Sequence, residues 1–171
     1  DVYKRQAFFP ATELPPDFHS LRIYRSKKGI LVRDGHPVIE AYEKAGVMTW
    51  ELLNRWPAVC VTAGMKDGGA KSVEGRRVGV VLPYFLTVPY VVARTDFTFE
   101  GPLITLRRFM MDSQFQFRIL PMPEESGPFE PRLVWHHCTH TDPFLQWVRG
   151  LVVDAARSEA RLLGVIDTSE E

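Results

Sequence analysis

The last long periodic stretch of the chain decides how we interpret its fold: residues 141–164 read TDPFLQWVRGLVVDAARSEARLLG. Asp142 followed by Pro143 is a strong helix start, because the carboxylate accepts backbone N–H groups and Pro suits the first helical position. Gly164 is a typical helix end. We therefore expect one helix over residues 143–163. Its apolar face is predicted to contain Phe144, Val148, Leu151, Val152, Ala155 and Leu162.

The chain ahead of this helix is made of short apolar segments separated by turns. A strand pair is expected at residues 21–25 and 30–32, followed by helices that begin at Pro37 and divide at Gly46. Residues 78–93 are strongly apolar but are shorter than a membrane span and contain Pro83 and Pro89, so we expect strand, bend, strand and no transmembrane helix. Further strands are expected at residues 58–61, 94–99, 103–110, 114–120 and 133–140.

This order of elements predicts an α+β fold, in which a curved antiparallel sheet is crossed by the long C-terminal helix. We expect residues 1–20 to form an extended arm, residues 21–166 a single domain, and residues 167–171 an acidic tail. A chain of 171 residues is long enough to bury a core without disulfides or metals.

The turn at residues 100–102 and the terminal helix are the features that carry a family resemblance. Over roughly residues 21–163 the order of elements resembles the helix-grip fold of the START-related superfamily. That resemblance implies a space between sheet and helix that holds a lipid, a hormone or another apolar ligand, and some members are enzymes. No motif matches position by position, so no functional residue carries over; another sheet-plus-helix arrangement is the alternative.

Residues 1–6, DVYKRQ, match the translation of a common sequencing-library adapter. We therefore exclude them from the fold argument as artefactual and predict that they make no core contacts. The chain's own start, its targeting and its localisation remain unknown on this basis.

Charge and cysteine content exclude several classes of protein. Lys and Arg number 21 and Asp and Glu number 21, so the net charge is zero. This balance argues against a nucleic-acid partner bound mainly by electrostatics and leaves open a local basic patch. The two cysteines, Cys60 and Cys138, cannot form a disulfide framework or a four-cysteine zinc site.

A histidine-rich segment at residues 135–142 is the candidate metal site. If residues 133–140 form a strand, His136, Cys138 and His140 stand in a row on one side. Imidazole and thiolate are good zinc ligands, and three of them leave a position open for catalysis. Three in-line residues do not converge easily, so the alternative is a strand end with solvated histidines, and we expect no metal cofactor.

A second candidate site binds a ligand. Glu159 falls within the predicted apolar face of the terminal helix, where a carboxylate needs a partner or a proton. Arg107 and Arg108 could supply that partner, and Trp135 completes the candidate set. The alternative places Glu159 in water or beside a neighbouring arginine.

These observations favour a non-catalytic domain that binds an apolar or lipid-like ligand, or that serves as an accessory subunit of a larger assembly. The protein partner would contact the N-terminal arm and residues 78–93. The alternatives are a metal-dependent enzyme that uses His136, Cys138 and His140, and a small-molecule enzyme with Glu159 as its acid or base.

Overall fold

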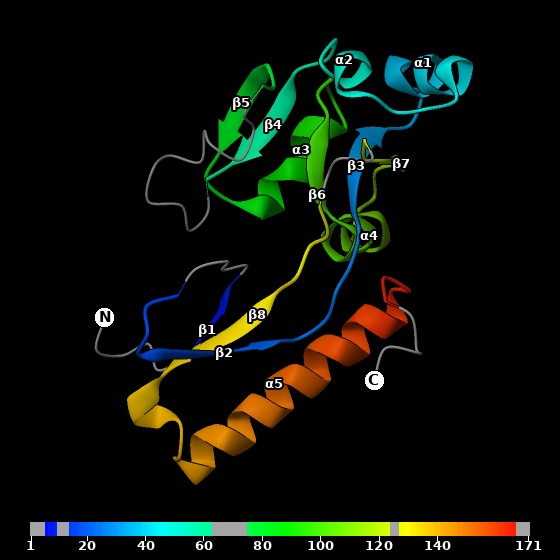
Figure 1. The fold of residues 1–171 in the computed structure, drawn as a ribbon. Coiled ribbons are helices and arrows are strands. Elements are labelled where there is room, and N and C mark those ends of the chain that lie inside the picture. The colour runs from blue at the N-terminus through cyan, green and yellow to red at the C-terminus, as the bar shows by residue number, and fades with distance from the viewer. Residues whose placement is uncertain (1–5, 10–13, 63–74, 124–126, 167–171) are drawn as a thin grey trace. The chain divides into compact units, whose positions relative to one another are not determined.

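The computed structural model describes residues 6–9, 14–62, 75–123 and 127–166 (Figure 1). The chain divides into two compact units. The first unit contains Asp1–Lys27 and Pro128–Glu171, and the second contains Lys28–Gly127. That residues 21–166 form one domain stays a prediction. Of the residues that we predict to be artefactual, 1–5 lie outside the described residues and Gln6 is described.

The first unit is built around strand β8, Arg132–His136. It pairs antiparallel with β1, Gln6–Phe9, on one side and with β2, Phe18–Arg22, on the other. An isolated antiparallel bridge between Ser26 and Phe129 joins the two segments of the unit again. The sequence predicted a strand at 133–140, but β8 ends at His136 and a 3-10 turn, η3 His137–Thr139, follows it.

Helix α5, Pro143–Leu162, confirms the predicted terminal helix. The Asp142 carboxylate accepts the N–H groups of Phe144 and Leu145 at 3.0 and 3.1 Å, so the helix begins as its capping residue predicts. The helix also contacts the segment after β2, because Arg157 Nε donates to the carbonyl of Ile23 at 2.8 Å.

The predicted apolar face of α5 is wrong. The side chains of the helix that are buried are Leu145, Arg149, Val153 and Ala160. Phe144 is 65% exposed and Leu162 is 74% exposed. The buried residues of α5 therefore lie on a different side of the helix from its most hydrophobic residues. Arg149 can lie on the buried side because its methylene stem is apolar and its guanidinium finds backbone acceptors nearby.

The second unit is centred on β3, Lys28–Arg33, in a sheet of order β6-β3-β7. Its neighbours, β6 Phe99–Pro102 and β7 Phe117–Pro121, are both antiparallel to it. Leu31 packs in one apolar cluster, while Ile30 and Val32 pack in another on the opposite face. A strand that is buried on both faces needs a continuous apolar run, which explains the sequence ILV.

Two helices of this unit follow β3. Helix α1, Pro37–Ala45, ends at Gly46, whose φ of 71° is the left-handed conformation that glycine adopts without cost. Helix α2, Trp50–Leu53, begins where Thr49 Oγ1 accepts the N–H of Leu52 at 3.1 Å. The predicted start at Pro37 and division at Gly46 are thus confirmed.

Strands β4, Ala58–Val61, and β5, Val78–Leu82, pair parallel. The prediction of a second strand within residues 78–93 is wrong, since a 3-10 turn, η2 Phe85–Thr87, and helix α3, Val88–Val92, follow β5. Pro89 lies in the first turn of α3, where a backbone N–H would have no acceptor within the helix, so proline is tolerated there.

The strand predicted at 103–110 is wrong as well, because helix α4 covers Leu103–Asp112. Its buried residues Leu106 and Phe109 are three apart, which is the helical spacing. The residues predicted as a turn, 100–102, are part of β6, which pairs with β3. A Cβ on Gly29 would lie 2.9 Å from Ile119 Cγ2, so a glycine is needed where this part of β3 packs.

The α+β class with antiparallel sheets and a C-terminal helix is confirmed. Across the described ranges, no helix is both long and apolar enough to cross a membrane, in agreement with the prediction for residues 78–93.

Candidate functional site

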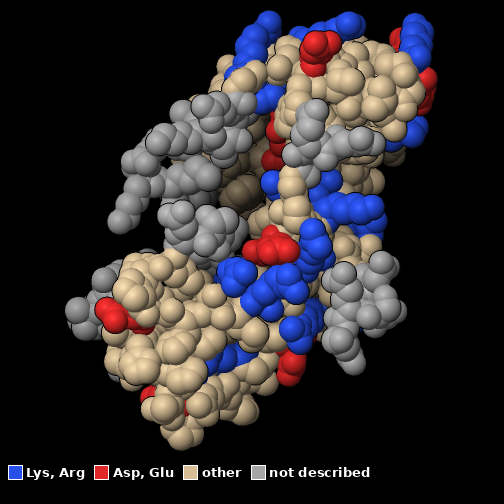
Figure 2. All heavy atoms as spheres, in the orientation of Figure 1, with Lys and Arg blue, Asp and Glu red and all other residues tan. Residues whose placement is uncertain are grey.

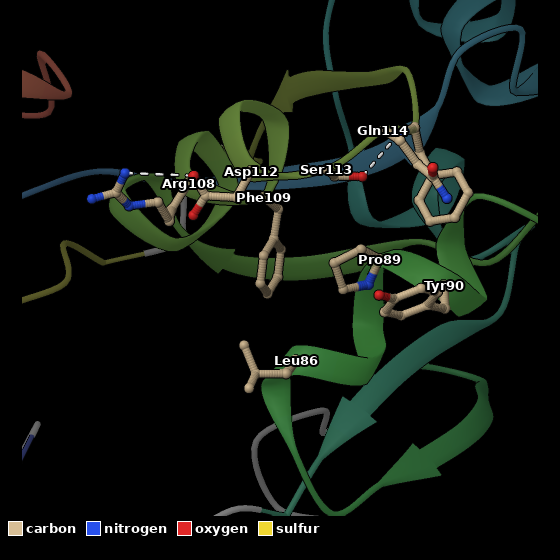
Figure 3. Close-up of a pocket in the computed structure, with 9 residues that line it drawn as sticks. Leu86, Pro89, Tyr90, Arg108, Phe109, Asp112, Ser113 and Gln114 are labelled. Atoms are coloured by element: carbon tan, nitrogen blue, oxygen red, sulfur yellow. Dashed lines mark hydrogen bonds and ion pairs between the residues drawn. The ribbon is translucent and has the colours of Figure 1, made fainter.

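The second unit contains an open groove of about 460 Å³ between η2 and α3 on one side and α4 with its following turn on the other (Figure 3). This volume lies within the range of small-molecule pockets. The residues that line it are Leu86, Pro89, Tyr90, Arg108, Phe109, Asp112, Ser113, Gln114 and Phe115.

The groove is apolar at its centre and polar at its rim. In Figure 3, Phe109 of α4 points toward Leu86 of η2 and Pro89 of α3. At the rim, Arg108 Nη1 lies 3.6 Å from Asp112 Oδ1, so the two charges offset each other. Tyr90 meets the Phe115 ring edge-on at 5.6 Å between centroids. Such a lining suits a small ligand with an apolar body and a polar end.

The turn after α4 is held by its own hydrogen bonds and by a cation. Ser113 Oγ accepts the N–H of Phe115 at 2.9 Å, which fixes the position of that ring. The Arg94 guanidinium lies 4.8 Å from the centre of the same ring. The aromatic wall of the groove is therefore positioned before any ligand arrives.

A second cluster of aromatic side chains lies at one end of the sheet in the first unit. His19 stacks on His140 with 4.1 Å between ring centroids, and His19 Nε2 lies 2.9 Å from His137 Nδ1. Trp135 Nε1 donates to His140 Nδ1 at 3.2 Å. The Arg149 guanidinium lies 4.7 Å from the Trp135 ring centre. We call these five residues the histidine cluster.

Arg149 holds the turn that carries two of these histidines. It is 7% exposed, and its guanidinium donates to the carbonyls of Thr139 and His140 at 3.3 and 2.9 Å. Partial burial, the neighbouring His140 and His137, and the Arg149 charge together lower the pKa of His19. The imidazole of His19 is therefore more readily neutral than an ordinary histidine.

The structure separates the residues of the predicted metal row. His136 Nδ1 accepts the N–H of Cys138 at 3.2 Å, while His140 Nδ1 accepts from Trp135. The expected row on one face is wrong because the strand stops at His136. Over the described ranges, no group of three or more His, Cys, Asp or Glu side chains converges to hold a metal. Metal binding by this set stays a prediction.

The predicted ligand-binding residues fall in different places. Glu159 is half-buried on α5 of the first unit, and Trp135 is buried in the histidine cluster of that unit. Arg107 and Arg108 lie on α4 of the second unit, where Arg108 lines the groove. A ligand role for these four residues stays a prediction.

Sequence reasoning missed His19 and the aromatic side chains of the groove. His19 reaches the cluster because β2 pairs with β8 and places it opposite Trp135. A contact between positions so far apart in the sequence has no local signal. The groove could have been found only by recognising the helical spacing of residues 103–112.

Comparison with known proteins identifies relatives of this chain among transcriptional regulators. No family model matches the chain. "HTH-type transcriptional regulator SyrM 1" of Sinorhizobium fredii is 26% identical over 152 residues, which are 84% of this chain and 43% of that protein. The SyrM regulator of Rhizobium meliloti is 31% identical over 77 residues, 45% of this chain and 23% of that protein. The chain thus spans less than half the length of the curated relatives it matches.

Several solved structures with the same architecture are regulatory domains. The regulatory domain of MexT, a transcriptional activator in Pseudomonas aeruginosa, has a TM-score of 0.67 at 21% identity, over 87% of this chain and 71% of that one. This chain has the fold of these regulatory domains. MetR of N. meningitidis, a LysR family regulator, has a TM-score of 0.65 at 10% identity, over 92% of this chain and 71% of its regulatory domain.

A third structure adds a ligand. The effector-binding domain of QuiR in complex with shikimate has a TM-score of 0.65 at 12% identity, over 90% of this chain and 72% of that one.

The helix-grip prediction is therefore wrong, since the strands belong to separate sheets and the fold matches the regulatory domains instead. The predicted lipid-binding or accessory-subunit function, with its metal-dependent alternative, is overturned by the same relatives, which are transcriptional regulators. The exclusion of a nucleic-acid partner also loses its support, because the curated relatives are HTH-type regulators. The net charge of this chain describes only this chain, which spans less than half the length of those relatives.

Proposed function

We propose that this chain is the effector-binding regulatory part of a LysR-type transcriptional regulator, and that the whole protein acts on DNA. One observation carries this proposal: the relation to SyrM 1 and the fold of the MexT regulatory domain both extend over more than four fifths of the chain. In such a protein the regulatory part binds a small molecule, and its differential affinity for two states shifts the population between them.

A chimera tests this function directly. The 152 matched residues of SyrM 1 are replaced by this chain, and transcription from a SyrM 1-dependent promoter is measured with a reporter. We expect expression well above that of the truncated regulator without the segment. The matched control carries Leu31→Asp, which places a charge in the apolar core and should abolish the response. Equal expression with both inserts would contradict the proposal.

We further propose the groove of the second unit as a site for a small effector with an apolar body. Its aromatic wall, Tyr90 and Phe115, is fixed by the contacts described above, and its rim offers Arg108 and Asp112. Shikimate, the ligand named for QuiR, and benzoate, an aromatic acid of similar size, are suitable first probes.

The groove is tested by binding to the purified chain. We expect Tyr90→Ala to weaken probe binding about tenfold or more, since this ring forms one wall, and Met111→Ala to leave it unchanged. Met111 is 63% exposed on the same helix as Arg108 and is not among the lining residues, so it is a matched control. Unchanged binding in Tyr90→Ala would show that the probe binds outside this groove. It would not contradict the regulatory function, which the chimera tests separately.

We also propose that apolar side chains exposed on β5 and before η2 contact a protein partner, as the sequence predicted for residues 78–93. Val81 is 53% exposed and Tyr84 is 68% exposed. Light scattering on the purified chain tests this: Val81→Lys should shift an oligomer toward the monomer. A mass that is the same for both proteins would contradict this contact.

A further inference from the structure

The pair of ring nitrogens in the histidine cluster is not explained by an effector-binding role. His19 Nε2 and His137 Nδ1 lie 2.9 Å apart, so one hydrogen is shared between two imidazoles. Both rings belong to well-defined elements: His19 lies on β2 opposite Trp135, and His137 opens the turn η3. The backbone N–H of His137 also donates to the carbonyl of Asp17 at 2.7 Å, which ties the turn to the start of β2.

This separation matches two adjacent ligands on a metal ion. Histidine nitrogens bind divalent metals at roughly 2.0–2.1 Å, and two nitrogens 2.9 Å apart then subtend about 90° at the metal. An angle of about 90° belongs to square-planar, tetragonal or octahedral coordination, which Cu(II) and Ni(II) adopt. Tetrahedral zinc would require about 3.3 Å between the nitrogens.

Among the described residues, these two nitrogens are hydrogen-bonded to each other and to no third side chain. His140 stacks on His19 and directs its Nδ1 to Trp135, so it positions the His19 ring. His137 is exposed and His19 half-exposed, which gives solvent access. Figure 2 shows few Lys, Arg, Asp or Glu side chains on the visible face over the end of β8 and the start of α5.

We propose that His19 and His137 bind one Ni(II) or Cu(II) ion, with water completing the coordination shell. On binding, the ring that donates the shared hydrogen carries it on its other nitrogen, so both rings stay neutral and each offers a lone pair to the ion. The Arg149 charge behind Trp135 opposes a cation, so we expect it to weaken binding of the ion. This site would give the protein a metal input separate from an organic effector.

The test is a calorimetric titration with NiCl₂ of the chain purified without a histidine tag. Cys138 adjoins His137 and is exposed, so all variants carry Cys138→Ser to remove the thiol as a ligand. We expect one Ni(II) per chain, with binding weakened at least about tenfold in His19→Asn and in His137→Asn. His136→Asn is the matched control, because asparagine also offers an acceptor to the Cys138 N–H and the change lies outside the pair.

Three results would overturn the site: absence of stoichiometric Ni(II) in the Cys138→Ser chain, equal binding in all variants, or loss in His136→Asn with retention in His19→Asn. Melting temperatures of each variant, measured without metal, separate loss of a ligand from loss of the fold. Electron paramagnetic resonance with Cu(II) adds a direct readout, since the parent chain should show the splitting pattern of two coordinated nitrogens and each pair variant that of at most one. The result of this titration does not depend on the result of the chimera experiment, because the two test separate proposals.

Discussion

The two units of the chain achieve stability in different ways. In the second unit, β3 is buried on both faces, and apolar side chains on each side pack against helices and neighbouring strands. In the first unit, the end of β8 packs against imidazole rings, and the buried residue beneath Trp135 on α5 is an arginine. Apolar burial involves no titrating group, whereas contacts between imidazoles and a guanidinium depend on protonation. The comparison predicts that the units differ in what destabilises them.

The largest effect is expected where the second unit is most apolar. Leu31→Ala should lower the free energy of unfolding by about 2–5 kcal/mol, because Leu31 is fully buried and the surrounding cluster can relax only in part. Urea unfolding followed by circular dichroism measures this loss. Leu86→Ala, at a residue that is 79% exposed, should change the free energy by less than about 0.5 kcal/mol. Similar losses for the two variants would refute the assignment of the core.

Arg149 is the corresponding test in the first unit. Arg149→Ala should cost about 2–3 kcal/mol, since it leaves the carbonyls of Thr139 and His140 without their donors and removes the cation over Trp135. Arg149→Lys keeps the charge but cannot donate to both carbonyls in the same plane, so it should recover only part of the loss. Urea unfolding followed by tryptophan fluorescence measures both. Full recovery by lysine would show that charge alone matters.

Protonation should affect both units, because each contains a histidine with a lowered pKa. Burial lowers the pKa of His36, against an opposing influence of Asp96, and its Nδ1 accepts the N–H of Val38 at 3.0 Å at the start of α1. The unfolded chain then binds more protons than the folded one just below pH 6.5. Stability is therefore complete above that pH and declines as the pH falls through the folded pKa.

His36→Asn should flatten this decline while it keeps an acceptor for the helix start. Urea midpoints between pH 5 and 8 give the slope for each variant. His19→Asn is the counterpart in the first unit, where the pKa is also lowered. If His19→Asn alone flattened the dependence of stability on pH, the acid sensitivity would belong to the first unit.

The smaller effects concern helix ends. Asp142→Ala should cost about 1 kcal/mol, because two N–H groups at the start of α5 lose their acceptor. Asp142→Asn should retain most of the stability, since its amide oxygen can still accept. Thermal unfolding of the three proteins provides the comparison, and equal melting temperatures for the alanine and asparagine variants would contradict the cap.

The smallest effect is expected for an exposed ion pair of α1. Lys44 Nζ lies 2.7 Å from Glu40 Oε1, one helical turn away. Lys44→Ala should cost at most about 0.5 kcal/mol, and the loss should disappear in high salt because exposed charges are screened. A larger or salt-independent loss would show that burial, and not charge, is involved.

Local signals explain which parts of this structure could be predicted. The start of α5 at Asp142 and Pro143, the start of α1 at Pro37 and its end at Gly46 depend on residues within one turn, and all were predicted correctly. The sequence predicts strands where helices α3 and α4 lie, because their short apolar runs fit either period. Tertiary packing decided them by burying Leu106 and Phe109, three residues apart, on one side.

The sequence by itself determined the α+β class, the capped ends of the helices and the absence of a predicted membrane span in residues 78–93. These features depend on local hydrogen bonding, proline and the length of apolar runs. Only the tertiary structure decided which face of α5 is buried, which helices line the groove, and which histidines meet. His19 lies opposite Trp135 because two strands from distant parts of the chain pair in one register, and such pairing follows from the packing of the whole unit.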